Sequence, residues 1–199
     1  MRTEVRGRLE SFIKRHRVFT AAQAKALGIS SGLLAHYAKK GLLRRVGRGL
    51  YVSAQHEPEI DPIWEELVYS VLSIPNAVVC YTTALILHGL TDEVARQYWV
   101  AIPHDTTVGK RPHVRTVRMR HHGLGISKIK LGEIDVPVYD LERSLVEGFK
   151  SASLDVAIKA LKQAFEPGRK PRPSPAKLYE YAKKLRVPID QYLTMVTTT

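Results

Sequence analysis

Ten residues between positions 30 and 48 have side chains suited to contact with a nucleic acid. Hydroxyl and imidazole groups bond to base edges and phosphates, lysine and arginine neutralise phosphates, and Gly or Ala lets a backbone approach closely. The chemistry expected of such a set is binding, with bases contacted by the small residues and phosphates by the cations. The set is Ser30, Ser31, Gly32, Ala35, His36, Lys39, Lys40, Arg44, Arg45 and Arg48.

Two short predicted helices separated by a glycine would position the first seven of these residues. The first runs from Thr20 to Leu27 and ends before Gly28, and the second begins after an N-cap at Ser30 and ends near Lys40, before Gly41. This order is typical of a helix-turn-helix, whose second helix enters the DNA major groove. Apolar spacing places on the buried side Ile29, Leu34, Tyr37, Ala38 and Leu42.

The last three residues of the set lie on a predicted hairpin. Two apolar runs, Leu42 to Val46 and Leu50 to Val52, flank Gly47-Arg48-Gly49, which places an arginine at the tip. A generic three-helix domain with solvated lysines would account for the helices alone. The basic hairpin beside them favours a DNA-binding winged helix, completed by an amphipathic helix over residues 3–16.

The positive charge is concentrated in the same part of the chain. Residues 1–55 hold twelve Lys and Arg residues and two Glu residues, a net charge of +10 out of +12 for all 199 residues. We therefore expect a polyanionic partner at this end, namely double-stranded DNA. Residues 56–199 are nearly balanced in charge.

The remainder of the chain, residues 60–199, is expected to form a second domain after the winged helix of residues 1–55. The fold class predicted for the whole chain is α+β, an N-terminal winged helix-turn-helix followed by a mixed α+β domain with helices on one side of short strands. Expected N-caps are Asp61, Asp140, Ser153 and Ser174, with Thr82 or Thr83 before a helix at 84–88. Expected strands span 77–80, 97–102, 114–120, 126–131 and 134–138, and the further helices span 62–72, 141–149, 154–165 and 176–185.

A second basic patch lies between residues 110 and 130. It allows two interpretations, a second contact with DNA or RNA and a strand with a solvated basic face. Three histidines, His113, His121 and His122, lie among these cations, but no Cys, Asp or Glu is close at metal-ligand spacing, so we expect no metal site. The candidate contact residues of the patch are Arg115, Arg118, Arg120 and Lys128.

The sequence gives no pattern that predicts an enzyme. It contains no phosphate-binding Gly-rich loop with Lys-Ser/Thr, no His-Glu-x-x-His and no Gly-x-Ser-x-Gly. Asp135, Glu142 and Lys130 could form a carboxylate–lysine site, but the acids occupy ordinary strand and helix positions. The single Cys80 lies in an apolar run, and no apolar run is long enough to cross a bilayer. We expect a cytoplasmic protein with no catalytic residues and no cofactor.

Several motifs in one order resemble the AbiEi-type antitoxins of type IV toxin–antitoxin systems. They are the "AxALGIS" turn, "GLLRRVGRGLYV" (41–52), "YTTALILHGLTD" (81–92), "YWVAIP" (98–103) and "IDVPVYDLERSLVEGF" (134–149). The resemblance covers roughly residues 3–165. Residues 166–199, with the run PGRKPRPSP, match nothing in it.

The resemblance implies a function that residue spacing does not give. Such proteins repress their own operon by binding inverted repeats cooperatively, and a monomer in solution is expected here. Their C-terminal domain counteracts a nucleotidyltransferase toxin without a stable complex, so residues 60–199 are expected to neutralise a toxin without the winged helix. Two alternatives stay open: an effector-responsive regulator without a toxin, and an RNA-binding protein that uses the patch at 110–130.

Overall fold

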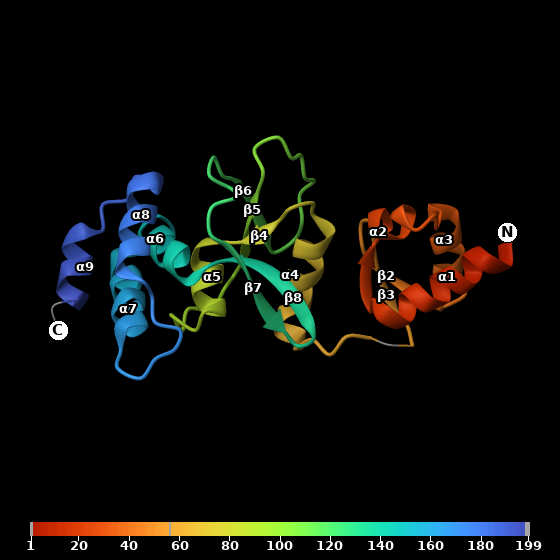
Figure 1. The fold of residues 1–199 in the computed structure, drawn as a ribbon, viewed down its shortest axis with the longest axis horizontal. Helices are drawn as coiled ribbons and strands as arrows, with labels where there is room; N and C mark the ends of the chain where they lie inside the picture. Colours follow the sequence, from red (N-terminus) through yellow and green to blue (C-terminus); the bar gives the residue numbers. More distant parts are fainter. Residues whose placement is uncertain (1, 56, 198–199) are drawn as a thin grey trace. The chain divides into compact units, whose positions relative to one another are not determined.

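A computed structural model describes residues 2–55 and 57–197 (Figure 1). The chain divides into two compact units, Met1–Pro75 with Lys130–Asp135, and Asn76–Ile129 with Val136–Thr199. Helix α4, Pro62–Ser73, belongs to the first unit and contacts strands β2 and β3 there. The expected fold class, a helix-turn-helix domain followed by a mixed α+β part, is confirmed.

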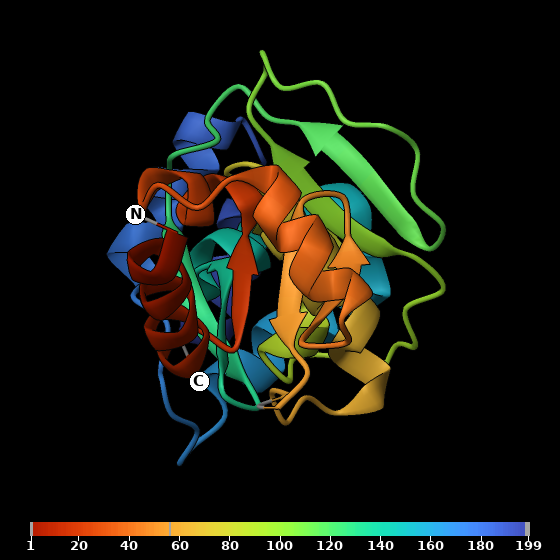
Figure 2. The same ribbon diagram turned by 90° about the vertical axis from the view of Figure 1, so that its right-hand side faces the viewer.

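The first unit begins with three helices packed on a three-stranded antiparallel sheet (Figure 2). The strand order is β1-β3-β2. Strand β1 was not expected from the sequence, because it is three residues long and exists through its pairing with β3, Val18 to Val52 and Thr20 to Leu50. The elements are α1 Arg2–Arg15, β1 Val18–Thr20, α2 Ala21–Ala26, α3 Ser31–Lys39, β2 Leu43–Gly47 and β3 Leu50–Ser53.

Local capping explains where α2 and α3 begin and end. Thr20 and Gln23 form a reciprocal capping box at the start of α2, and the Ser30 hydroxyl accepts from the Leu33 N–H at 3.3 Å. Gly28 and Gly41 follow the two helices with φ of +77° and +71°, a backbone conformation that glycine adopts without strain. The predicted helix-turn-helix is thus formed. Its core includes Leu9, Phe12, Phe19, Ile29, Leu34, Tyr37, Leu43 and Tyr51.

The second unit is built on a five-stranded sheet of order β6-β5-β4-β8-β7. Strand β4 is antiparallel to β5 and parallel to β8, while β5 and β6 are parallel. Strands β6 and β7 therefore form the two edges. The strands are β4 Val78–Val79, β5 Tyr98–Ile102, β6 Val114–Arg118, β7 Ile126–Leu131 and β8 Ile134–Tyr139.

Five helices complete this unit in successive layers. Helix α5 contacts β5, α6 packs on α5, and α7 and α8 pack on α6, with α9 against α7 and α8. Helices α6 to α9 lie together at the C-terminal end of the chain (Figure 1). The helices are α5 Tyr81–Leu87, α6 Leu141–Ser151, α7 Leu154–Phe165, α8 Pro175–Leu185 and α9 Asp190–Thr197.

One expectation about this unit was wrong, and one helix was not predicted. Helix α5 begins at Tyr81 with Cys80 as its N-cap, not after Thr82 or Thr83, because the Thr83 hydroxyl accepts from the Trp99 N–H at 2.8 Å instead. Asp190–Thr197 form helix α9, which the sequence pattern did not predict. Leu193 of α9 is fully buried in the core between these helices.

Candidate nucleic-acid interface

The outward side of α3 is exposed along its whole length. Leu34 and Tyr37 face the core, as the spacing predicts. The Ser30 hydroxyl is occupied by its cap, so this residue serves the helix first. This cap takes the Leu33 N–H, while the N–H groups of Ser31 and Gly32 have no acceptor within the helix and lie at its positive dipole end, so they suit an anion such as a phosphate. Exposed side chains or backbone are found at Ser30, Ser31, Gly32, Ala35, His36, Lys39 and Lys40.

The hairpin that follows is short and anchored. Gly47 pairs with Leu50 after a register shift at Val46, so only Arg48 and Gly49 lie between the paired residues. The Gly49 carbonyl accepts from the Ala21 N–H at 2.7 Å, which fixes the turn to the start of α2. A tight turn of this kind cannot swing away from the helices. It holds Arg48, which is exposed, at a defined place.

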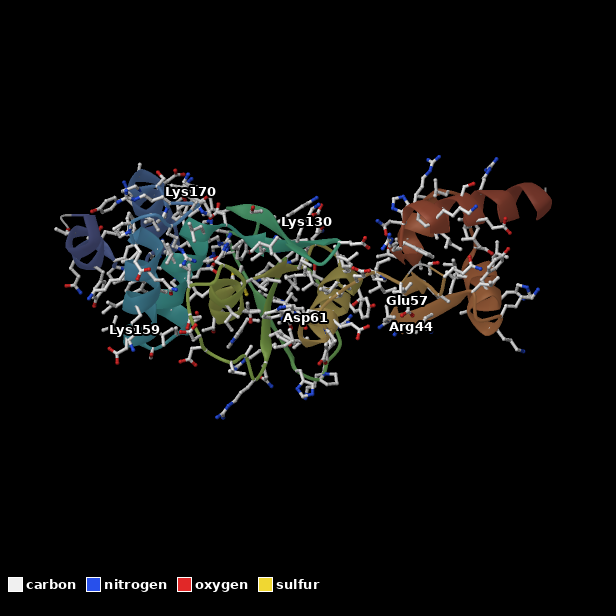
Figure 3. All side chains as sticks on the ribbon, turned by 90° about the horizontal axis from the view of Figure 1, so that it is seen from below. Arg44, Glu57, Asp61, Lys130, Lys159 and Lys170 are labelled. Carbon is white, nitrogen blue, oxygen red and sulfur yellow. The ribbon has the colours of Figure 1, made fainter. Side chains whose placement is uncertain are left out.

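The two arginines of β2 are engaged with the protein itself. The Nε of Arg44 donates to Glu57 at 3.0 Å, and its Nη2 lies 3.5 Å from Glu65 (Figure 3). The Nε of Arg45 donates to the Gly47 carbonyl at 3.2 Å and so supports the turn. A phosphate would have to compete with two carboxylates for Arg44. No local pattern in the sequence predicts this pairing, because Glu57 lies 13 positions after Arg44.

Three cations of the candidate interface are free of such competition. Lys39, Lys40 and Arg48 are exposed, and none of them pairs with a carboxylate in the part of the chain that the structure describes. They are the groups best able to exchange water and counterions for phosphate oxygens. The candidate interface thus has a graded set of cations, with Lys39, Lys40 and Arg48 ahead of Arg44 and Arg45.

The structure does not bring the second basic patch together. Arg115 and Arg118 lie on β6, one edge of the sheet, and Lys128 lies on β7, the other edge. Four strand spacings separate these edges, about 19 Å. Arg115 stacks over the Trp99 ring at 4.6 Å, and Arg118 donates to the Thr106 carbonyl at 3.3 Å.

The acids of the second unit have structural partners. Asp140 caps α6 by accepting from the Arg143 N–H at 2.9 Å, and Glu142 accepts from the Ser174 N–H at 3.0 Å and from Lys177 at 3.2 Å. These bonds cap α6 and join it to the start of α8. Cys80 is fully buried, and burial raises the pKa of its thiol well above the ordinary value, which disfavours the nucleophilic thiolate.

Sequence reasoning missed one grouping of charged residues in this unit. Arg118 and Arg120 line a cavity together with Lys150 and with cations near the end of α8. No pattern of neighbouring residues could have shown it, because these segments are separated by 30 or more positions in the chain. Within the described residues, no group of three or more His, Cys, Asp and Glu side chains could hold a metal ion, and no helix could span a membrane.

Comparison with known proteins agrees with the N-terminal part of this description. Residues 8–54 match the family described as a transcriptional regulator, AbiEi antitoxin, which confirms the resemblance for the winged helix. No curated protein matches the chain in sequence. The fold is similar to that in a crystal structure of the RV2827C protein from Mycobacterium tuberculosis, with a TM-score of 0.55 and 13% identity over 97% of this chain and 76% of that one.

Proposed function

We propose that this protein, whose winged helix matches the AbiEi antitoxin regulators, represses its own operon and counteracts a nucleotidyltransferase toxin. The observation that supports DNA binding is that the outward side of α3 is exposed. The residues of this helix also lie within the segment that matches the family of transcriptional regulators. In the proposed complex, Ser31, Gly32 and Ala35 approach base edges in the major groove. Lys39 and Lys40 contact the flanking phosphates.

Arg48 is the second group that contacts DNA in the proposed complex. Because its turn is bonded to the start of α2, the guanidinium reaches a phosphate or the minor groove without ordering a long loop. Each neutralised phosphate contributes about −0.9 to the slope of log K against log salt concentration. Binding through Lys39, Lys40 and Arg48 therefore predicts a steep salt dependence that the alanine variants reduce stepwise.

The test is a fluorescence-anisotropy titration of the protein's own promoter fragment at several salt concentrations. Arg48→Ala and Lys39→Ala should each weaken binding to all sequences and flatten the slope by about 0.9. The matched control is Lys159→Ala, which removes an equally exposed charge from α7 and should leave affinity and slope unchanged. Unchanged binding in both interface variants would show that α3 and the hairpin are not the DNA-binding surface.

The antitoxin part of the proposal assigns toxin neutralisation to residues 60–199 and predicts that it does not need DNA binding. The full chain carrying both Arg48→Ala and Lys39→Ala should restore growth, as the wild type does, when it is co-expressed with the nucleotidyltransferase toxin that this proposal predicts in the same operon. Protein levels are compared by immunoblot, because a lost protein would mimic a lost activity. If the double variant is present at the wild-type level and growth still stops, neutralisation depends on DNA binding and this part of the proposal is wrong.

A further inference from the structure

The second unit contains a cavity of about 540 Å³ whose walls are strongly cationic. Seven lysine and arginine side chains line it, against a single carboxylate, Glu147. They come from the end of β6, from α6 and from the end of α8, which the fold brings together. The six that are exposed are Arg118, Arg120, Lys150, Lys183, Lys184 and Arg186.

The seventh cation, Arg143, forms the floor and is fully buried. Its Nε donates to Glu147 Oε1 at 3.0 Å, and its Nη1 donates to the His121 carbonyl at 2.7 Å and to the Leu124 carbonyl. Its guanidinium also stacks on the Tyr139 ring at 3.3 Å. Arg143 is therefore committed to the protein, where it holds the 121–124 turn and compensates the charge of Glu147. It leaves ligand binding to the other six cations.

Three of those six are bonded to the protein through part of their donors. Lys150 donates to the Leu185 carbonyl at 2.6 Å, Lys184 to Glu180 at 2.7 Å and Arg118 to the Thr106 carbonyl. Arg120, Lys183 and Arg186 have no carboxylate partner among the described residues. Like charges that converge on a concavity repel one another and focus a positive potential in it. An anion with several oxygens would relieve this repulsion.

Glu147 gives a second, independent indication of the kind of ligand that the cavity would bind. The residue is 3% exposed, and its Oε2 is buried without a hydrogen bond of good geometry in the described part of the chain, although the Tyr81 N–H lies close enough to offset part of the rise that burial causes in the pKa of the carboxyl. A buried polar atom without a partner is unfavourable and rare in folded proteins. Glu147 lines the cavity, but its Oε2 lies beneath the surface, so a ligand with an O–H or N–H group satisfies this atom only when the carboxylate turns toward the cavity. A ligand that fits this cavity therefore has both an anionic group and a hydrogen-bond donor. The volume of the cavity lies in the range usual for small-molecule sites.

We propose that this cavity binds a nucleoside triphosphate. The phosphates lie among Arg120, Lys183 and Arg186, and a hydroxyl or amino group of the nucleoside donates to Glu147 Oε2. Tyr81, which is half-buried at the start of α5, lines the same cavity, and its ring packs edge-to-face on Trp99 with the ring centroids 5.3 Å apart. Neither α3 nor the hairpin takes part, so the site is independent of the proposed DNA-binding surface.

The experiment is isothermal titration calorimetry of the full chain with ATP, GTP, CTP, UTP and pyrophosphate. At least one nucleoside triphosphate should bind the wild type, and more tightly than pyrophosphate, which lacks the donor part. The variant Arg120→Gln with Lys183→Gln should weaken binding of that nucleotide about tenfold or more, as expected for two lost charge-assisted contacts. The matched control, Lys110→Gln with Lys128→Gln, loses the same charge outside the cavity and should bind as the wild type does.

Glu147→Gln tests the donor contact separately. It keeps the side-chain shape and an oxygen for Arg143 but changes the buried acceptor, so nucleotide affinity should fall toward that of pyrophosphate while pyrophosphate affinity stays the same. A thermal melt checks that this buried variant folds. Should it not fold, the exposed double variant still decides the proposal.

Several results would overturn the proposal. They are no nucleotide binding at millimolar concentration, equal affinity for pyrophosphate and every nucleotide, or equal loss in the cavity variant and its control. Binding of a single-stranded oligonucleotide without binding of any nucleotide would make the surface a polynucleotide contact. The DNA-binding variant Arg48→Ala with Lys39→Ala should bind the nucleotide normally, so failure of one proposal leaves the other testable.

Discussion

The two cationic regions of this protein differ in how their charges are held. In the first unit, Lys39, Lys40 and Arg48 stand exposed on one helix and the turn after it, nine positions apart at most. In the second unit, seven cations from distant segments line a cavity, and one of them, Arg143, is fully buried. Exposed charges on a short segment contribute little to stability and remain free to bind phosphates. A buried charge is paired within the fold, so its removal should lower the stability of the fold more than it lowers the affinity for a ligand.

The largest effect is therefore expected from Arg143→Met. This change leaves Glu147 buried without its ion pair, and breaking a buried pair from one side costs about 3–5 kcal/mol. The matched control is Arg48→Met, which should change stability by less than about 0.5 kcal/mol because the side chain is exposed and unpaired. Urea denaturation followed by far-UV circular dichroism measures both. Equal stability loss in the two variants would remove the distinction between the regions.

A smaller effect is expected from Ser30→Ala, which tests the recognition helix itself. The hydroxyl caps α3 through the Leu33 N–H, and loss of such a cap costs about 1 kcal/mol. Ser153→Ala removes the equivalent cap of α7 and serves as the control in the other unit. Hydrogen exchange should show increased opening of α3 in the first variant and of α7 in the second. Opening of both helices in either variant would mean that the two units unfold together.

Much of this fold could be predicted because helix starts are local. Ser30, Asp61, Asp140, Ser153 and Ser174 each cap the helix that the sequence assigned to them, since the acceptor and the N–H lie two or three residues apart. The missed elements depend on distant partners. Strand β1 requires β3, more than 30 positions later, and α9 is held by contacts such as Tyr192 stacked on Phe149.

The same rule separates the two candidate sites. The exposed side of α3 follows from a helical period within eleven residues, so its members could be named from the sequence. The pairing of Arg44 with Glu57 crosses the hairpin, and the cavity joins β6, α6 and α8, so neither had a local signature. At the second basic patch, Arg118 and Lys128 are ten positions apart in the sequence but lie on opposite edges of the sheet, so closeness in the sequence does not put them on one surface.

The smallest effect is expected at Arg44, which is partly exposed like the interface cations but paired with carboxylates like the buried Arg143. Its guanidinium is half-exposed but already paired with Glu57 and Glu65, so a phosphate must displace a carboxylate to reach it. Arg44→Gln should flatten the salt slope of DNA binding by clearly less than the roughly 0.9 expected for Arg48→Gln. Its stability should fall by no more than about 1 kcal/mol, since exposed pairs contribute little.

The partner carboxylate gives the reverse test of the same pair. Glu57→Gln frees Arg44 and removes a negative charge beside it, so DNA affinity should rise and the salt slope should steepen. Glu166→Gln, an exposed acid in the second unit, is the control for the change in net charge. If Arg44→Gln flattens the slope as much as Arg48→Gln, and Glu57→Gln changes nothing, the carboxylates do not restrain Arg44 in solution. The grading of the interface cations would then reduce to exposure alone, because ion pairing would no longer distinguish Arg44 from Arg48.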